Sequence, residues 1–174
     1  GMRPNQHIPF QFSLHIIHNG SVELHAYLAD SMKDPRREFI EKLKEVIGTT
    51  GSIIVYNQTF EQSRLKELAD LFPEHTKWVE SINERIIDLL TPFRDFSYYN
   101  PKQEGSASIK DVLPVLTGKD YADLEIANGS DASTLYYNTT LGTLTKEEIQ
   151  KIRNNLETYC ALDTEAMVWI VDEL

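Results

Sequence analysis

Two alternating apolar segments joined by an Asn-Gly dipeptide constrain the fold of this chain more than any other feature. Every second residue is apolar on both sides of the turn: Phe10, Phe12, Leu14 and Ile16 before it, and Val22, Leu24 and Ala26 after it. Asn19-Gly20 is typical of a tight turn, because both residues accept the positive φ that such turns need. The pattern predicts a β-hairpin between Ile8 and Leu28.

After the hairpin the apolar spacing becomes helical. Asp34 is a candidate cap, Pro35 suits the first helical position and Gly48 ends the pattern, which predicts a helix of about 13 residues. Ser52-Ile53-Ile54-Val55 predicts a buried strand at 52–56. Further helices are predicted over about 60–71, 76–90, 108–118 and 131–141, and from the capping box at Thr145 to the C-terminus.

The order of elements is therefore hairpin, helix, strand and then mostly helices. A parallel strand reached through a helix makes a right-handed β-α-β crossover, so an α/β or α+β three-layer domain is expected rather than an all-helical one. With 174 residues, 41% of them hydrophobic, the chain can bury a core of its own. We expect a single domain over residues 2–174.

Composition excludes several classes of protein. The net charge of −10 argues against sequence-independent coating of nucleic acid, whose affinity comes from phosphate neutralisation. A small acidic site remains compatible with a phosphodiester, since a bound cation supplies positive charge there. One cysteine, Cys160, forms no internal disulfide, and no secretory or membrane-spanning apolar run is present, so we expect a cytoplasmic protein without membrane contact.

Two places carry residues suited to chemistry. Asn57 and Glu61 follow the predicted strand at the start of a helix, and Tyr159 and Asp163 stand at i and i+4 of the C-terminal helix, about 6 Å apart at Cβ. Both places also have structural interpretations. With Phe60 packed inward, Glu61 falls at a helix N-terminus, where the dipole favours an anion by about 0.3–1 kcal/mol. Tyr159 can equally be a half-buried tyrosine beside a surface aspartate.

Taken in order, these residues resemble the motifs of a known nuclease branch. Asn57-x-x-Phe60-Glu61 is similar to the second motif, and Tyr159-x-x-x-Asp163 to the third motif, of the DEDD exonucleases, the DnaQ-like branch of the ribonuclease H-like superfamily. The segments Ile8-Pro9-Phe10-Gln11-Phe12-Ser13-Leu14-His15 and Ser108-Ile109-Lys110-Asp111-Val112-Leu113-Pro114 extend the resemblance. With them the chain looks most like an uncharacterised bacterial domain family of unknown function within that branch, over nearly its whole length.

The resemblance implies a ribonuclease H-like three-layer fold, with a mixed sheet, the hairpin at its N-terminal side and flanking helices. It also implies a metal-dependent 3′–5′ exonuclease, in which four carboxylates hold two Mg²⁺ or Mn²⁺ ions. By this resemblance Asp163 and Glu61 are metal ligands. Tyr159 assists the attacking water and Asn57 orients neighbouring groups.

Two departures from the family pattern matter. Position 61 is Glu where the superfamily has Asp, which shifts the carboxylate by about 1.5 Å in a site with narrow Mg²⁺ geometry. The first motif, Asp-x-Glu on the first strand, is missing. It would lie just before Ile8, where the chain offers only Met2 to His7 once Gly1 is set aside as a residue left by tag cleavage. Neither Asp123-Leu124-Glu125, in a loop, nor Asp163-Thr164-Glu165, whose acids lie about 200° apart on a helix, replaces it.

We therefore expect an exonuclease-like domain that hydrolyses nucleic-acid phosphodiesters in its parent protein, while this chain binds metal weakly or not at all and is inactive. A catalytically silent ribonuclease H-like module that binds nucleic acid or a protein is the alternative, and a plain interaction domain is a third. His15, His18 and His25 have no zinc-site spacing and are expected to be structural. A sheet without its first strand exposes backbone groups, which predicts a homodimer through the sheet.

Overall fold

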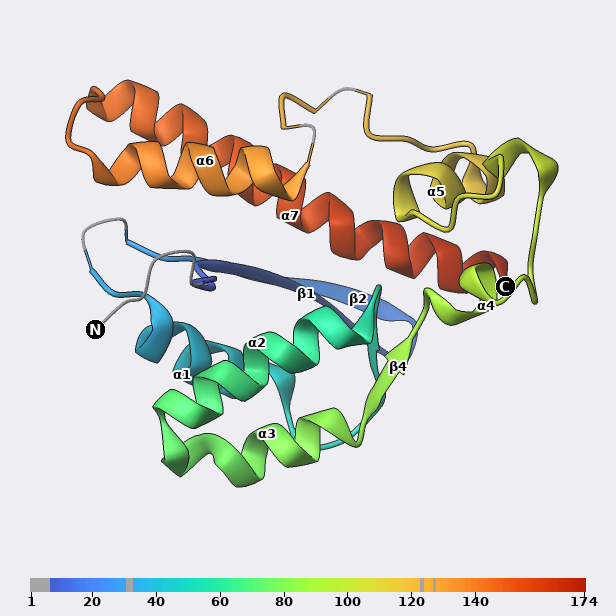
Figure 1. Cartoon of the computed structure of the whole chain (residues 1–174), viewed down its shortest axis with the longest axis horizontal. Coiled ribbons are helices and arrows are strands. Elements are labelled where there is room, and N and C mark those ends of the chain that lie inside the picture. Colours follow the sequence, from blue (N-terminus) through green and yellow to red (C-terminus); the bar gives the residue numbers. More distant parts are fainter. Residues whose placement is uncertain (1–6, 31–32, 123, 127) are drawn as a thin grey trace. The chain divides into compact units, whose positions relative to one another are not determined.

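The computed structural model describes residues 7–30, 33–122, 124–126 and 128–174 (Figure 1). The chain divides into two compact units. The first comprises residues 1–48 and 121–165, and the second comprises residues 49–120 and 166–174.

The first unit begins with the predicted hairpin, which is confirmed. Strand β1 (Gln11–His18) pairs antiparallel with β2 (Ser21–Leu28) in unbroken register from Gln11↔Leu28 to His18↔Ser21. Asn19 and Gly20 have φ values of 49° and 80°, as a two-residue turn between twisted strands requires. One face of the hairpin packs aromatic rings on the next helix, where Phe12 meets Phe39 edge to face at 5.4 Å.

Helix α1 (Arg36–Ile47) follows as predicted, with its start shifted by one residue. Pro35 occupies the N-cap rather than the first helical position. Asp34 still acts as a cap, because its Oδ1 accepts the backbone N–H of Arg36 at 3.2 Å. Gly48, at φ 64°, ends the helix as expected.

Two helices complete the first unit, α6 (Gly129–Thr140) and the N-terminal part of α7 (Lys146–Glu173). The predicted capping box is confirmed, because the backbone N–H of Thr145 donates to Glu148 at 2.8 Å and that of Glu148 donates to the Thr145 hydroxyl at 3.2 Å. Ile126, Ala132 and Leu156 form the buried core between these segments.

The other face of β1 bonds to α7 through polar side chains. Gln11 donates to the carbonyl of Leu156 at 2.6 Å, and the buried Ser13 hydroxyl donates to the carbonyl of Cys160 at 2.6 Å. Further along the same face, His15 Nδ1 and the Thr164 hydroxyl are 2.8 Å apart. This histidine therefore has the structural contact that the sequence suggested.

The second unit is built on two short parallel strands. Strand β3 (Ile53–Val55) pairs with β4 (Ile86–Asp88), with Val55 opposite Asp88. The chain between them forms α2 (Gln58–Leu71), η1 (Pro73–His75) and α3 (Thr76–Asn83). The predicted helix over 76–90 is wrong beyond Asn83. Its last third is strand β4, because pairing with β3 satisfies the backbone of this apolar segment.

The rest of the second unit contains three further helical elements, of which only α5 (Ile109–Thr117) was predicted. Helix α4 (Thr91–Arg94) and η2 (Pro101–Gln103) precede α5, which begins at the Ser108 cap and ends at Gly118. Phe93, Val112 and Leu113 are almost fully buried in this part. The remaining elements of this unit are the last residues of α7.

The fold is mixed α/β and mostly helical, which confirms the predicted class at that level. The strands that the structure describes form two sheets of two strands each, one antiparallel and one parallel, instead of the single mixed sheet that we expected. In the described part of the chain, no helix has both the length and the apolar character needed to cross a bilayer.

Candidate functional site

The carboxyl ends of β3 and β4 are joined through one carboxylate. Asp88 is the last residue of β4, and its Oδ1 accepts the backbone N–H groups of Asn57 at 2.9 Å and Leu90 at 3.1 Å. Asn57 precedes α2 in the left-handed region at φ 81°. Asn57 thus contacts Asp88 through its backbone, while its side chain is exposed. Its expected role in orienting neighbouring groups stays a prediction.

Glu61 lies in the first turn of α2, as predicted, but for a different reason. Phe60 was expected to pack inward, and it is 53% exposed. Glu61 stands four and seven residues before the buried Leu65 and Leu68, so it shares their face of the helix. The acid, not the phenylalanine, points to the interior.

The buried position perturbs Glu61 strongly. Its Oε2 is buried, with no hydrogen-bond partner among the described residues. Burial and then the negative charge of Asp88 raise the pKa of Glu61 to about 7, against the opposing charge of Arg64. A carboxylate in this state gains from a nearby cation, because the cation would offset both causes of the shift.

Arg64 adds a guanidinium to the same region. Its Nη2 donates to Glu67 at 2.8 Å, whereas its Nε and Nη1 are buried and have no hydrogen-bond partner in the part of the chain that is described. Unsatisfied buried donors on a guanidinium suit an anionic oxygen, because charge-assisted bonds of this kind are the strong ones.

Tyr159 and Asp163 lie together on α7 in the first unit, one turn apart as their spacing predicted. Burial raises the pKa of Tyr159 above its ordinary value, and the charge of Asp163 and a hydrogen bond to it raise it further. The ring of Tyr159 packs against the core of Ile126, Ala132 and Leu156. At neutral pH Tyr159 is therefore a hydrogen-bond donor and not a base.

The predicted residues thus fall into two groups. Glu61 and Asn57 lie with Asp88 in the second unit, and Tyr159 lies with Asp163 in the first. That Glu61 and Asp163 meet stays a prediction. Across the described residues, no three His, Cys, Asp or Glu side chains are grouped so as to hold a metal ion.

Of Asp123 and Glu125, the acids considered as a replacement for the first motif, Glu125 has a structural role. Glu125 is exposed and bonds to Lys151 at 3.1 Å and Asn155 at 2.6 Å, which identifies it as a surface ion pair. Asp123 lies outside the described residues.

Sequence reasoning missed Asp88, because the segment around it matched a helical pattern. The available signal was the repeat of one local pattern, since Ile86-Ile87-Asp88 matches Ile53-Ile54-Val55 in its paired β-branched residues. An acid directly after such a pair lies at the carboxyl edge of a parallel sheet, where ligands commonly bind.

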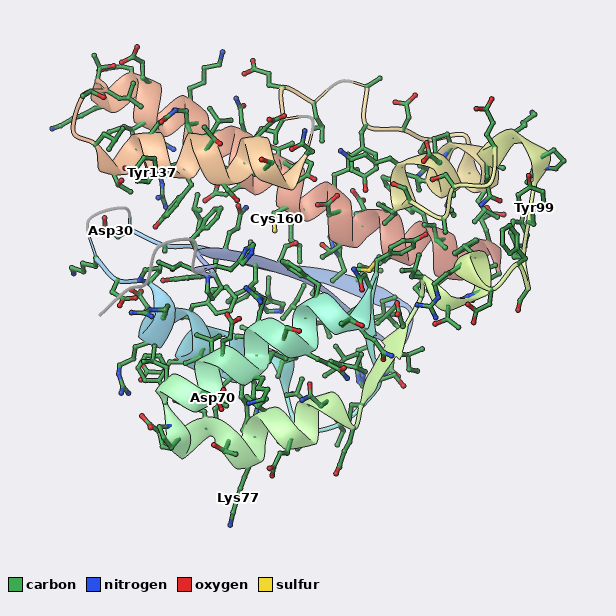
Figure 2. All side chains as sticks on the ribbon, viewed as in Figure 1. Asp30, Asp70, Lys77, Tyr99, Tyr137 and Cys160 are labelled. Carbon is green, nitrogen blue, oxygen red and sulfur yellow. The ribbon has the colours of Figure 1, made fainter. Side chains whose placement is uncertain are left out.

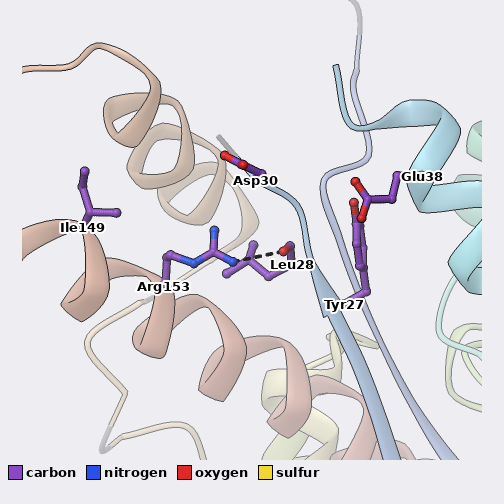
Figure 3. A pocket seen from close by; sticks show the side chains of 6 residues that line it. All are labelled: Tyr27, Leu28, Asp30, Glu38, Ile149 and Arg153. Atoms are coloured by element: carbon purple, nitrogen blue, oxygen red, sulfur yellow. Dashed lines mark hydrogen bonds between the residues drawn. The ribbon is translucent and has the colours of Figure 1, made fainter. Parts of the chain in front are cut away.

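A cavity of about 450 Å³ lies in the first unit (Figure 3). Its lining includes the charged side chains of Asp30, Glu38 and Arg153. The guanidinium of Arg153 is engaged by the carbonyls of Leu28 at 3.0 Å and Ala29 at 2.8 Å. None of the predicted site residues lines this cavity.

Comparison with known proteins places the chain in a family. The model of a domain of unknown function, DUF2779, matches residues 1–108. The chain belongs to the DUF2779 family. The matched range contains Glu61 and Asp88, whereas Tyr159 and Asp163 lie beyond it.

Three curated proteins resemble this DUF2779 chain. "Uncharacterized protein UU173" of Ureaplasma parvum is 29% identical over an alignment of 178 positions, which covers 88% of this chain and 26% of that protein. "Uncharacterized protein MG366" of Mycoplasma genitalium is 31% identical, over 78% of this chain and 22% of the relative. A homolog of the latter in Mycoplasma pneumoniae is 30% identical, over 79% of this chain and 24% of the relative.

The chain thus spans about a quarter of the length of the curated relatives that it matches. No solved structure matches it.

Proposed function

We propose that this chain is part of a metal-dependent 3′–5′ exonuclease-like domain of ribonuclease H-like fold, which hydrolyses nucleic-acid phosphodiesters in its parent protein. The observation that carries the proposal is the buried, unpartnered Oε2 of Glu61 next to Asp88, at the carboxyl ends of two parallel strands. The second-motif and third-motif resemblance, at Glu61 and at Asp163, supports the same chemistry.

The residues present fit one divalent cation better than two. Glu61 and Asp88 offer two carboxylates within one unit, whereas the resemblance implies four, with Asp163 among them. Mg²⁺ keeps several waters and accepts one or two carboxylates, so a set of this size suits a single weakly held ion. When bound, the cation would polarise the phosphodiester and help to orient the attacking water.

The chain's own residues have distinct parts in this proposal. The backbone N–H groups of Asn57 and Leu90 hold Asp88 in place. The Arg64 guanidinium supplies positive charge that acts on Glu61. Tyr159, which stays protonated, would hold a water by donating to it or by orienting Asp163.

The chain itself is proposed to be inactive, because the first acidic motif is missing. No Asp or Glu occurs before Glu23, so β1 itself carries no carboxylate. The same observation favours the second candidate function, a catalytically silent module that binds nucleic acid or a protein.

The proposal is tested with a 5′-labelled single strand and Mn²⁺ or Mg²⁺. We expect the parent protein to shorten the strand from its 3′ end, and Glu61→Gln and Asp163→Asn to abolish this, while the 174-residue chain leaves the strand intact. A parent protein without metal-dependent hydrolysis would leave the silent module as the better account. Robust Mn²⁺-dependent hydrolysis by the chain alone would overturn its proposed inactivity.

A further inference from the structure

Two exposed aromatic rings follow α4 in the second unit. Phe96 is 62% exposed and Tyr99 is 46% exposed, and their ring centroids lie 5.5 Å apart with an interplanar angle of 60°. Tyr99 is labelled in Figure 2. The rings meet edge to face, so neither stacks flat on the other. A flat apolar ligand can therefore still reach the rings.

The backbone at Phe96 is strained. Its φ of 55° lies in the left-handed region, which a bulky residue adopts only at a cost in free energy. The exposed ring gains little burial in return. Glycine would adopt this conformation freely, so folding alone does not explain a phenylalanine here.

The segment that carries these rings is anchored beside the carboxylate site. The buried Phe93 stacks on Tyr56 at 6.4 Å and meets Tyr98 edge to face at 5.7 Å. The Tyr56 hydroxyl is fixed in turn by the carbonyl of Ala107 at 2.6 Å. Phe96 and Tyr99 thus flank in sequence a segment whose rings Phe93 and Tyr98 pack toward Tyr56, which directly precedes the residue that holds Asp88.

The chemistry of this surface favours an unpaired nucleobase. Exposed aromatic rings stack on any base, largely independently of its sequence. Lys102 is exposed nearby, and Arg94 is exposed while paired to Asp95 at 3.0 Å, so cations are available for the adjoining phosphates. In a chain with a net charge of −10, stacking can supply affinity that broad phosphate neutralisation cannot.

We propose that Phe96 and Tyr99 form a stacking platform for an unpaired base of a single-stranded nucleic acid. The inference rests on the proposed function, since it names how that site would hold its substrate. It makes no use of a metal ion. It can therefore be tested in EDTA, where hydrolysis plays no part.

The experiment compares two matched ligands by fluorescence anisotropy. One is a labelled single strand of about 12 nucleotides, and the other is an abasic strand of the same length and charge. We expect the base-bearing strand to bind more tightly, and Phe96→Ala with Tyr99→Ala to weaken its binding by roughly 5- to 100-fold without affecting the abasic strand. DNA and RNA versions of both strands show which sugar is preferred.

Further variants distinguish base stacking from a general apolar contact. Phe96→Trp should retain binding, whereas Phe96→Leu, apolar without a π face, should lose it. Phe96→Gly should also lose binding. The melting temperature of this variant should stay equal to that of the unmodified chain or rise, because glycine relieves the backbone strain at position 96. Tyr137→Ala removes an equally exposed ring, 60% accessible, from α6 in the first unit and should change nothing.

Equal affinity for the base-bearing and abasic strands, or unchanged discrimination after both rings are removed, would overturn the proposal. So would full binding by Phe96→Leu, which would point to a protein partner that needs only an apolar surface. If the parent protein fails to hydrolyse nucleic acid but the platform discriminates bases in EDTA, the exonuclease proposal alone fails. If the parent protein hydrolyses nucleic acid but Phe96 and Tyr99 do not discriminate bases in EDTA, the platform proposal alone fails.

Discussion

The backbone N–H of Asn57 donates to the Oδ1 of Asp88 at 2.9 Å and so fastens the end of β3 to the end of β4. The same oxygen accepts the N–H of Leu90 at 3.1 Å. One carboxylate therefore organises the point where two parallel strands end and α2 begins. The negative charge of Asp88 also acts on the buried carboxyl group of Glu61 and raises its pKa.

Asp88 should contribute to stability and to the electrostatics of the site in separable ways. Asp88→Ala leaves two backbone N–H groups without their acceptor and should lower the free energy of unfolding by about 1–2 kcal/mol. Asp88→Asn keeps an oxygen acceptor and should cost less, yet it removes the charge that raises the pKa of Glu61. Urea denaturation and a carbon-13 NMR titration of Glu61 measure the two effects. An unchanged pKa in Asp88→Asn would contradict the assignment.

Glu61 should make the stability of the chain depend on pH. Its folded-state pKa of about 7 lies above its ordinary 4.5, so the unfolded chain loses this proton first and stability falls as pH rises between these values. Glu61→Gln should be neutral at pH 4 and should stabilise the metal-free protein at pH 8, on the order of 1–3 kcal/mol.

Urea denaturation at both pH values measures this difference. The exposed Glu80→Gln on α3 is the matched control and should give the same small change at each pH. If Glu61→Gln behaves like this control, the burial argument for Glu61 fails.

Two variants of Tyr159 should distinguish the contribution of its ring to stability from that of its hydroxyl. Tyr159→Phe keeps the ring in the core of Ile126, Ala132 and Leu156 and should cost less than about 1 kcal/mol. Tyr159→Ala removes the ring and should cost about 2–3 kcal/mol. In the parent protein, Tyr159→Phe should nevertheless reduce hydrolysis. Equal destabilisation by both variants, measured in urea, would show that the hydroxyl has a structural role.

The hairpin was readable from the sequence because its signals are local. Alternation fixed the two faces of the strands, and Asn19-Gly20 fixed the turn and the register. The capping residues Ser108 and Thr145 likewise identified helix starts without reference to the rest of the chain. Sequence reasoning succeeds where one short segment contains all the residues that determine an element.

Helix α2 shows where local reasoning fails. A stripe through Phe60 looked apolar, but Phe60 lies about 140° around the helix from Leu65 and is exposed together with Leu71. The face that is buried carries Glu61, Leu65 and Leu68. Hydrophobic spacing assigns an acid to the surface by default, so it misses a carboxylate that the fold buries.

Strand β4 was missed for a related reason. Three residues are too few to distinguish a strand from a helical turn, and Ile82, Ile86 and Leu89 also have helical spacing. Only pairing with β3, about 30 residues earlier, decides the matter. The repeated pair of β-branched residues before Asp88 could have indicated a strand, but the position of Asp88 at the site depends on the long-range pairing with β3.

We propose that the chain forms a homodimer through its exposed hairpin. Ile17 and Val22 are direct partners in the register, each 53% exposed, and Leu24 is 50% exposed on the same face. Sedimentation should show a concentration-dependent dimer that Val22→Lys weakens. Leu71→Lys, at an exposed apolar position on α2, should leave it unchanged. A monomer at every concentration would refute this proposal.

The central claim is that Glu61 and Asp88 bind a divalent cation at the carboxyl ends of β3 and β4. Paramagnetic broadening of amide NMR signals by substoichiometric Mn²⁺ tests it most directly, because this measurement detects even weak binding. The amides of Asn57 and Leu90 should broaden first, and Glu61→Gln should abolish the effect, whereas the exposed Glu80→Gln should leave it unchanged. Broadening spread evenly over the acidic surface, or unchanged in Glu61→Gln, would contradict the claim.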